Sequence, residues 1–139
     1  MILLDTNVIS EPLKPAPNAA VVAWLDAQAI DTLFISAISV AELRFGIASM
    51  PSGKRQNVLS ERLEGEVLPH FDGRILPFNV STSRFYSELM AGARASGKAI
   101  GNADGYIAAT AAERGLAVAT RDASPFTAAG LTVLNPWMV

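Results

Sequence analysis

Short apolar runs alternate with helical segments along the whole chain, and this alternation restricts the possible folds more than any other feature of the sequence. Five strands are expected, near residues 2–5, 33–36, 74–77, 116–120 and 131–134. Strands that alternate with helices pair as a parallel sheet whose faces the helices cover. We therefore expect an α/β fold built around a twisted, mostly parallel sheet of five strands.

Capping and turn residues delimit the helical segments between these runs. A short helix should follow Asp5 and end before residues 12–17, and Ser124-Pro125 should cap another, with the proline at the first helical position. The remaining helices are expected from Asn18 to Gln28, from Ser39 to Met50–Gly53, from Lys54 to Val67 with Pro69 closing it, from Ser81 to Ser96, and from Ala103 to Arg114.

Four acidic residues lie at the boundaries of these elements. Asp5 closes the first apolar run, Glu42 lies near a helix start, Asp104 opens an alanine-rich helix, and Asp122 follows another apolar run. Ligands of an open parallel sheet collect outside the carboxyl ends of its strands. Carboxylates gathered there repel one another unless cations or raised pKa values relieve them. Mg2+ and Mn2+ prefer such oxygen ligands, so the pattern indicates metal-assisted phosphodiester chemistry.

The segments that carry these acids also resemble a known family in their order and spacing. They are MILLDTNVISE, SAISVAELRFG, ADGYIAATAAERGLAVATRD and the closing LNPW. Together they resemble the PIN-domain toxins of bacterial toxin–antitoxin pairs, the VapC family, and its FitB-like branch in particular. The resemblance spans nearly the whole chain. It implies a single PIN domain over residues 1–139, folded as an α/β/α sandwich.

The resemblance further implies the toxin of a type II toxin–antitoxin system, a Mg2+- or Mn2+-dependent endoribonuclease. Its partners would be an RNA substrate and a cognate antitoxin protein that inhibits it, with promoter DNA reached only through the antitoxin. A homodimer is expected, or a higher assembly with the antitoxin. The residues implied as catalytic and metal-binding are Asp5, Glu42, Asp104 and Asp122, with Thr6, Asn7 and Thr120 in support.

Two other functions stay open. One is a PIN-fold partner of a DNA-binding antitoxin, with little or no nuclease activity, acting in a promoter-binding regulatory complex. The other is a DNA-directed flap nuclease, which the lack of an insertion to thread a strand disfavours.

Each acid also has a purely structural interpretation. Asp5 could cap the short helix that follows it. Ser39 and Glu42 form a capping-box pattern, in which the glutamate bonds back to the backbone of the cap. The helix dipole favours Asp104 in a first turn regardless of function, and Asp122 could bond to local N–H groups. The fold decides between these interpretations and the metal site.

Composition and motif context exclude several other functions. The chain has no cysteine, so disulfides and thiolate metal sites are impossible. No apolar stretch approaches about 20 residues, and no basic start precedes the first apolar run, so we expect a cytoplasmic protein without membrane contact. Residues Gly92 to Lys98 match GxxxxGK, but Ala99 replaces the required Ser or Thr, and Gly97 is expected to end a helix.

Net charge alone leaves the partner undecided. The net charge is −2, although 4 of the 13 acidic residues belong to the candidate site. An amphipathic antitoxin segment is expected in a groove near the first helices, lined by residues such as Val8, Ile9, Leu43, Phe45 and Ile47. The cations that could contact phosphate, or could simply be solvated, are Arg44, Lys54, Arg55, Arg62, Arg94, Lys98 and Arg121.

Overall fold

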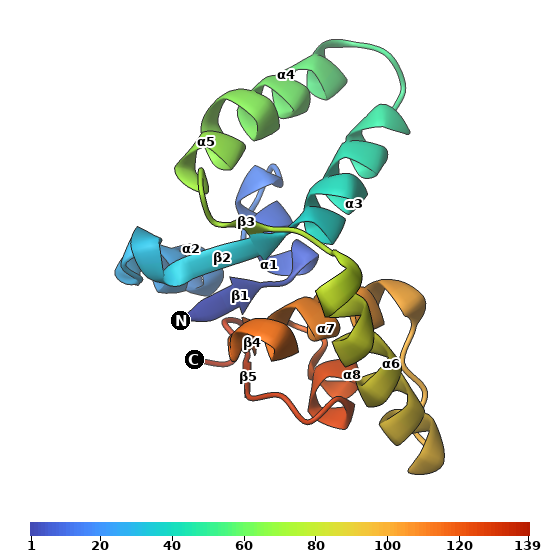
Figure 1. The fold of residues 1–139 in the computed structure, drawn as a ribbon. Coiled ribbons are helices and arrows are strands. Elements are labelled where there is room, and N and C mark those ends of the chain that lie inside the picture. Colours follow the sequence, from blue (N-terminus) through green and yellow to red (C-terminus); the bar gives the residue numbers. More distant parts are fainter.

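The computed structural model describes residues 1–139, and its centre is a sheet of five parallel strands (Figure 1). The strand order is β3-β2-β1-β4-β5, and every neighbouring pair is parallel. This confirms the expected α/β fold. The strands are β1 (Ile2–Leu4), β2 (Leu33–Ser36), β3 (Ile75–Leu76), β4 (Ala117–Ala119) and β5 (Val133–Leu134).

Helices cover both faces of the sheet and make three layers (Figure 1). Because side chains alternate along a strand, Leu4 and Ile35 face one core and Leu3 and Val118 face the other. The first core packs against α1 (Thr6–Ser10), α2 (Ala19–Ala27), α3 (Ala37–Ala48), the turn that follows α4 (Lys54–Arg62), and α5 (Leu68–His70). The second packs against α6 (Val80–Ala95), α7 (Asn102–Arg114) and α8 (Ala123–Ala128).

Short non-α turns complete the chain. Two 3-10 turns, η1 (Glu11–Leu13) and η2 (Ile30–Thr32), flank α2, and a π-helical turn, η3 (Leu63–Val67), joins α4 to α5. The helix expected to close at Pro69 therefore runs through the proline to His70, directly after the widened turn. None of the helices has both the length and the apolar character needed to span a bilayer.

Two helices begin two residues earlier than predicted. The third helix begins at Ala37, because the Ser36 hydroxyl accepts a hydrogen bond from the Ser39 N–H at 3.0 Å and caps it. The last helix begins at Ala123, with Asp122 rather than Ser124 at the cap position, so Pro125 is not its first residue.

The GxxxxGK segment is a helix end, as expected. Gly97 has a φ of 73°, in the left-handed region that glycine tolerates. Its N–H donates to the Arg94 carbonyl, and the Lys98 N–H donates to the Ala93 carbonyl at 2.9 Å. This pair of bonds is a Schellman motif, so the segment terminates α6 and forms no phosphate loop.

Candidate active site

Asp5 lies at the carboxyl end of β1 and is only 5% exposed. Its N–H donates to the Ala119 carbonyl at 2.9 Å, which continues the pairing of β1 with β4. One carboxylate oxygen accepts the Thr6 N–H at 2.8 Å, so Asp5 does cap α1. The other oxygen accepts the Thr120 hydroxyl at 2.8 Å. Two elements far apart in sequence thus fix this carboxylate.

Burial raises the pKa of Asp5 to about 6. The hydrogen bonds from Thr120 and Thr6 oppose this shift, and the nearby carboxylates of Asp104 and Glu42 add to it. A group that titrates this far above an ordinary aspartate is held in an environment that disfavours its charge. Such environments are characteristic of functional sites.

Asn7 and Thr120 support the buried carboxylate. The Asn7 amide nitrogen lies 3.3 Å from the Thr120 hydroxyl and 3.5 Å from an Asp5 oxygen. The Asn7 side-chain oxygen accepts the Arg121 N–H at 3.3 Å, and the Thr120 hydroxyl accepts the Asp122 N–H at 3.0 Å. These bonds tie the start of α1 to the segment that carries Asp122. Thr6, Asn7 and Thr120 therefore all lie where supporting residues are expected.

Glu42 is exposed in the second turn of α3, and its capping-box interpretation is wrong. The Ser39 N–H is already bonded to Ser36, so Glu42 has no role at the helix start. The Thr6 hydroxyl instead donates to a Glu42 oxygen at 2.7 Å and lies 2.8 Å from the Ser39 hydroxyl oxygen. Thr6 consequently links Glu42 to Asp5, because its N–H binds one acid and its hydroxyl binds the other.

Sequence reasoning missed the hydroxyl of Ser36 and considered Ser39 only as a helix cap. Both residues are fully buried beneath this edge, and their oxygens lie 3.3 Å apart. The signal was present in the sequence, since two serines three residues apart end an apolar run. Such a pair is typical of a strand that passes directly into a capped helix.

Asp104 and Asp122 approach the same edge from the other half of the chain. Asp104 is half-buried in the first turn of α7, and burial, followed by the carboxylates of Asp122 and Glu42, raises its pKa. The helix packs closely on the sheet, since Ala108, Ala109 and Ala111 are fully buried. Asp122 is exposed, and its carboxylate caps no N–H group of α8.

The four acids therefore form one electrostatically connected group, although their carboxylates are not arranged to coordinate one metal ion. Asp104 and Glu42 raise the pKa of Asp5, Asp122 and Glu42 raise the pKa of Asp104, and the three salt bridges of the chain involve different acids. Oxygen-only, anionic donors suit a hard divalent cation. As the side chains stand, no three of them are grouped closely enough to hold one ion. Glu42 and Asp122 are exposed, and the Thr6 hydroxyl is the single side-chain partner of Glu42, so both acids can adopt other rotamers.

Comparison with known proteins identifies the class to which this fold and site belong. The PIN domain family matches residues 2–130. The VapC ribonuclease Y4jK of Sinorhizobium fredii is 64% identical over 99% of this chain and 98% of its own length. Toxin FitB of Neisseria gonorrhoeae is 56% identical over 99% of each chain. The chain therefore belongs to the PIN-domain family, in the branch of the VapC and FitB toxins.

Solved structures agree with this assignment. The crystal structure of FitAcB from Neisseria gonorrhoeae has a TM-score of 0.97 and 55% identity, and each chain covers all of the other. VapBC2 from Rickettsia felis, bound to a DNA fragment from its promoter, has a TM-score of 0.78 and 26% identity, with 97% of this chain and 98% of that chain covered. These matches confirm the PIN-like sandwich.

Proposed function

We propose that this protein is the toxin of a type II toxin–antitoxin pair and acts as a divalent-metal-dependent endoribonuclease. One observation carries the proposal: four acids from separate elements converge on one sheet edge, and the most buried of them, Asp5, has a pKa raised to about 6. Two relatives are named as a ribonuclease and a toxin, which agrees with this chemistry.

In this proposal Asp5, Glu42, Asp104 and Asp122 hold Mg2+ or Mn2+. When bound, the cation would lower the pKa of a water molecule and offset negative charge on the phosphate oxygens. Thr120 and Thr6 hold Asp5 in one orientation, and Thr6 also holds Glu42. Because protonated Asp5 cannot ligate a cation, we expect metal affinity to fall as the pH drops through about 6.

The test combines metal binding with RNA cleavage. Isothermal titration with Mn2+ should give saturable binding to the wild-type protein and none to Asp104→Asn. Cleavage of a fluorescent RNA should be lost in the same variant. EDTA should abolish cleavage by the wild-type protein, and added Mn2+ should restore it. Asp72→Asn, at an exposed aspartate outside the site, is the matched control. Cleavage by Asp104→Asn at the wild-type rate would refute the site assignment.

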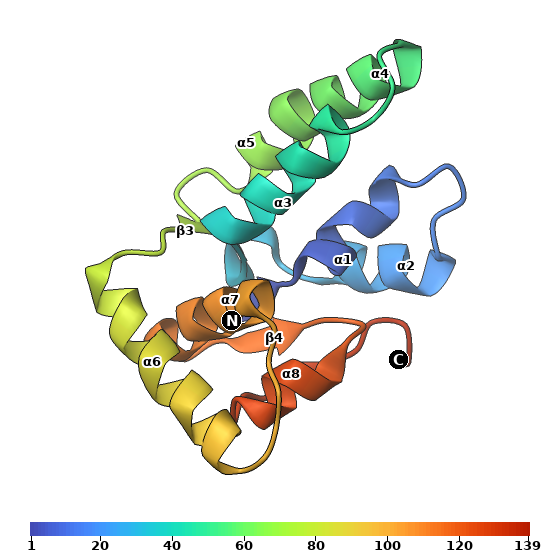
Figure 2. The same cartoon turned by 90° about the vertical axis from the view of Figure 1, so that its right-hand side faces the viewer.

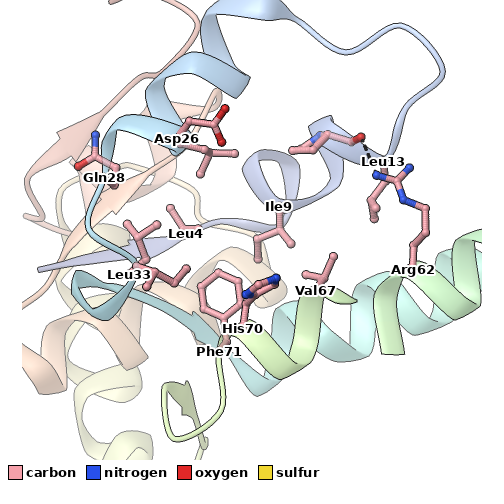
Figure 3. Close-up of a pocket in the computed structure, with 13 residues that line it drawn as sticks. Leu4, Ile9, Leu13, Asp26, Gln28, Leu33, Arg62, Val67, His70 and Phe71 are labelled. Atoms are coloured by element: carbon pink, nitrogen blue, oxygen red, sulfur yellow. Dashed lines mark hydrogen bonds between the residues drawn. The ribbon is translucent and has the colours of Figure 1, made fainter. Parts of the chain in front are cut away.

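The antitoxin is proposed to occupy an apolar pocket of about 480 Å3 beside α1, α2 and α5 (Figure 3). Of the residues expected to line a groove, Ile9 does line this pocket, and Leu43 and Ile47 line a neighbouring cleft. Val8 is fully buried in the core, and Phe45 is 75% exposed on the surface of α3. The pocket's apolar wall includes Leu4, Leu25, Leu33, Val67 and Phe71. An amphipathic segment would bury its apolar side chains there.

A regulatory complex with little nuclease activity is the second candidate function. The separation of the carboxylates favours it, because no three of them are close enough to share an ion. FitAB, a solved relative at 53% identity, is bound to a DNA fragment. The metal titration separates the two functions. Absence of Mn2+ binding by the wild-type protein, together with promoter binding by its complex, would favour the regulatory one.

A further inference from the structure

Two adjoining clefts lead away from the acidic edge. They lie between the segment after α1 and the α3–α4 hairpin, and the course of these two backbone segments can be followed in Figure 2. The first, of about 240 Å3, begins at Ser10 and Glu42. The second, of about 550 Å3, continues to Lys54 and Arg62. They share wall residues, so they form one groove; the shared residues are Leu13, Lys14, Arg55 and Leu59.

The outer part of this groove is basic. Its lining contains Lys14, Lys54, Arg55 and Arg62 and no acidic residue, although the chain carries a net charge of −2. Lys14 is paired with Glu11, at 2.8 Å between Nζ and Oε2, and the Arg62 guanidinium donates to a backbone carbonyl. Neither Lys54 nor Arg55 has a carboxylate within ion-pair distance.

The stability of α4 does not explain these two free cations. Lys54 and Arg55 occupy the first turn of α4, where the helix dipole disfavours positive charge. No acidic residue in that turn compensates for them. The local structure therefore loses free energy by placing them there. The positive charges of Lys54 and Arg55 are explained if the groove binds an anion along its length.

We propose that this groove, the basic track, holds the phosphate backbone of single-stranded RNA on one side of the scissile phosphate, with Lys54 and Arg55 contacting its phosphates. The inference rests on the proposed nuclease function. It adds the class of substrate, single-stranded RNA, and the course of that strand toward the acidic site. Proteins bind single strands by combining a positive groove for the backbone with apolar surface for the bases. Leu13, Val58 and Leu59 supply the apolar surface here.

The track also resolves an electrostatic difficulty of the site. Four carboxylates repel the RNA phosphates that must approach them, and a cation bound at the edge offsets only the charge nearest to it. Cations a short way along the same groove attract the flanking phosphates and release their counterions on binding. A flexible single strand can follow the groove to the recessed Asp5, whereas a duplex presents its phosphates on a rigid cylinder.

The test measures binding separately from cleavage. A fluorescein-labelled oligouridine is titrated with the full-length protein in EDTA at low salt, and anisotropy reports the affinity. K54E/R55E should bind about tenfold or more weakly, and log affinity should fall less steeply with log salt, by about 0.7 for each lost phosphate contact. Lys54→Ala and Arg55→Ala should each show part of this loss, which guards against misfolding of the double variant.

R94E/K98E is the matched control, because it changes the net charge equally. Arg94 and Lys98 lie at the end of α6, at the opposite end of the molecule from α4 (Figure 2). This control should bind within about twofold of the wild type, since only screened long-range charge is lost. Equal losses in the two double variants would overturn the track, because total charge alone would then explain the binding.

The remaining outcomes separate this inference from the nuclease proposal. If the wild type cleaves RNA but K54E/R55E binds the oligouridine as tightly, the track is wrong and the nuclease stands. That result would leave the groove to a protein partner. If the wild type neither binds the oligouridine nor cleaves RNA, both proposals fail together.

Discussion

Replacing Asp5 by asparagine should make the metal-free protein more stable at neutral pH. Asp5 titrates near pH 6 when folded, about 2 units above an unfolded aspartate, and each unit corresponds to about 1.4 kcal/mol. The folded state binds this proton more tightly than the unfolded state does. The contribution of Asp5 to the free energy of unfolding is therefore fully present below about pH 4. It is lost as the pH rises to about 6, by about 3 kcal/mol in total.

Asparagine removes the buried charge and keeps most of the geometry. Its oxygen can still accept the Thr6 N–H, while the bond from the Thr120 hydroxyl must reverse or break, at a cost of about 1 kcal/mol. The net gain at pH 7.5 should be about 2 kcal/mol. For a chain of this size it corresponds to a rise in Tm of roughly 4–8 °C.

The assay is thermal unfolding followed by circular dichroism in EDTA, at steps from pH 4 to pH 8. The difference in Tm between Asp5→Asn and the wild type should grow with pH and level off above about pH 6. Asp72→Asn should show no such trend. A constant difference across the series, or a variant less stable than the wild type at pH 7.5, would show that the buried charge of Asp5 does not destabilise the folded protein.

Three further predictions address the site and its partners. Thr6→Val should lower the rate of RNA cleavage about 10- to 100-fold, because Glu42 loses its hydroxyl partner, whereas Thr6→Ser should retain activity. We expect the wild type to be a homodimer in light scattering and Phe45→Glu to be a monomer, since Phe45 is 75% exposed on α3; a wild-type monomer at micromolar concentration would refute the dimer. We also expect a basic side chain of the antitoxin to reach the acidic edge and bind the same carboxylates as the metal. Affinity for the antitoxin should therefore fall as Mn2+ rises; an unchanged affinity across a metal series would place the partner in the apolar pocket alone.

The strands and the acid edge were predictable because both follow from local patterns. Apolar runs of strand length gave all five strands, and an acid directly after a run lies at the carboxyl edge of any parallel sheet. Asp5 illustrates the limit of this reasoning. Its place was predictable, but its raised pKa depends on how completely α1, β4 and the neighbouring carboxylates enclose it.

The predictions were wrong where two neighbouring residues fitted the same local pattern equally well. Ser36 and Ser39 both suit a helix cap, and the structure uses Ser36, the residue at which β2 ends against β3. That choice depends on strand pairing between distant segments. Val8 was likewise expected to line a groove, yet only its neighbour Ile9 does. Consecutive apolar residues on one short helix do not reveal which of them faces the sheet.

The unfavourable charge of Asp5 also bears on which proposed function applies. A chain that serves only as a partner for a DNA-binding protein gains nothing from a buried carboxylate that opposes folding by about 3 kcal/mol. Asparagine would satisfy the same helix cap without that cost. Strain of this kind is tolerated at functional sites because activity requires it. A divalent cation is the ligand that would offset it, since binding to the folded state alone adds stability. The energetics of this one residue therefore favour a nuclease over a purely regulatory protein.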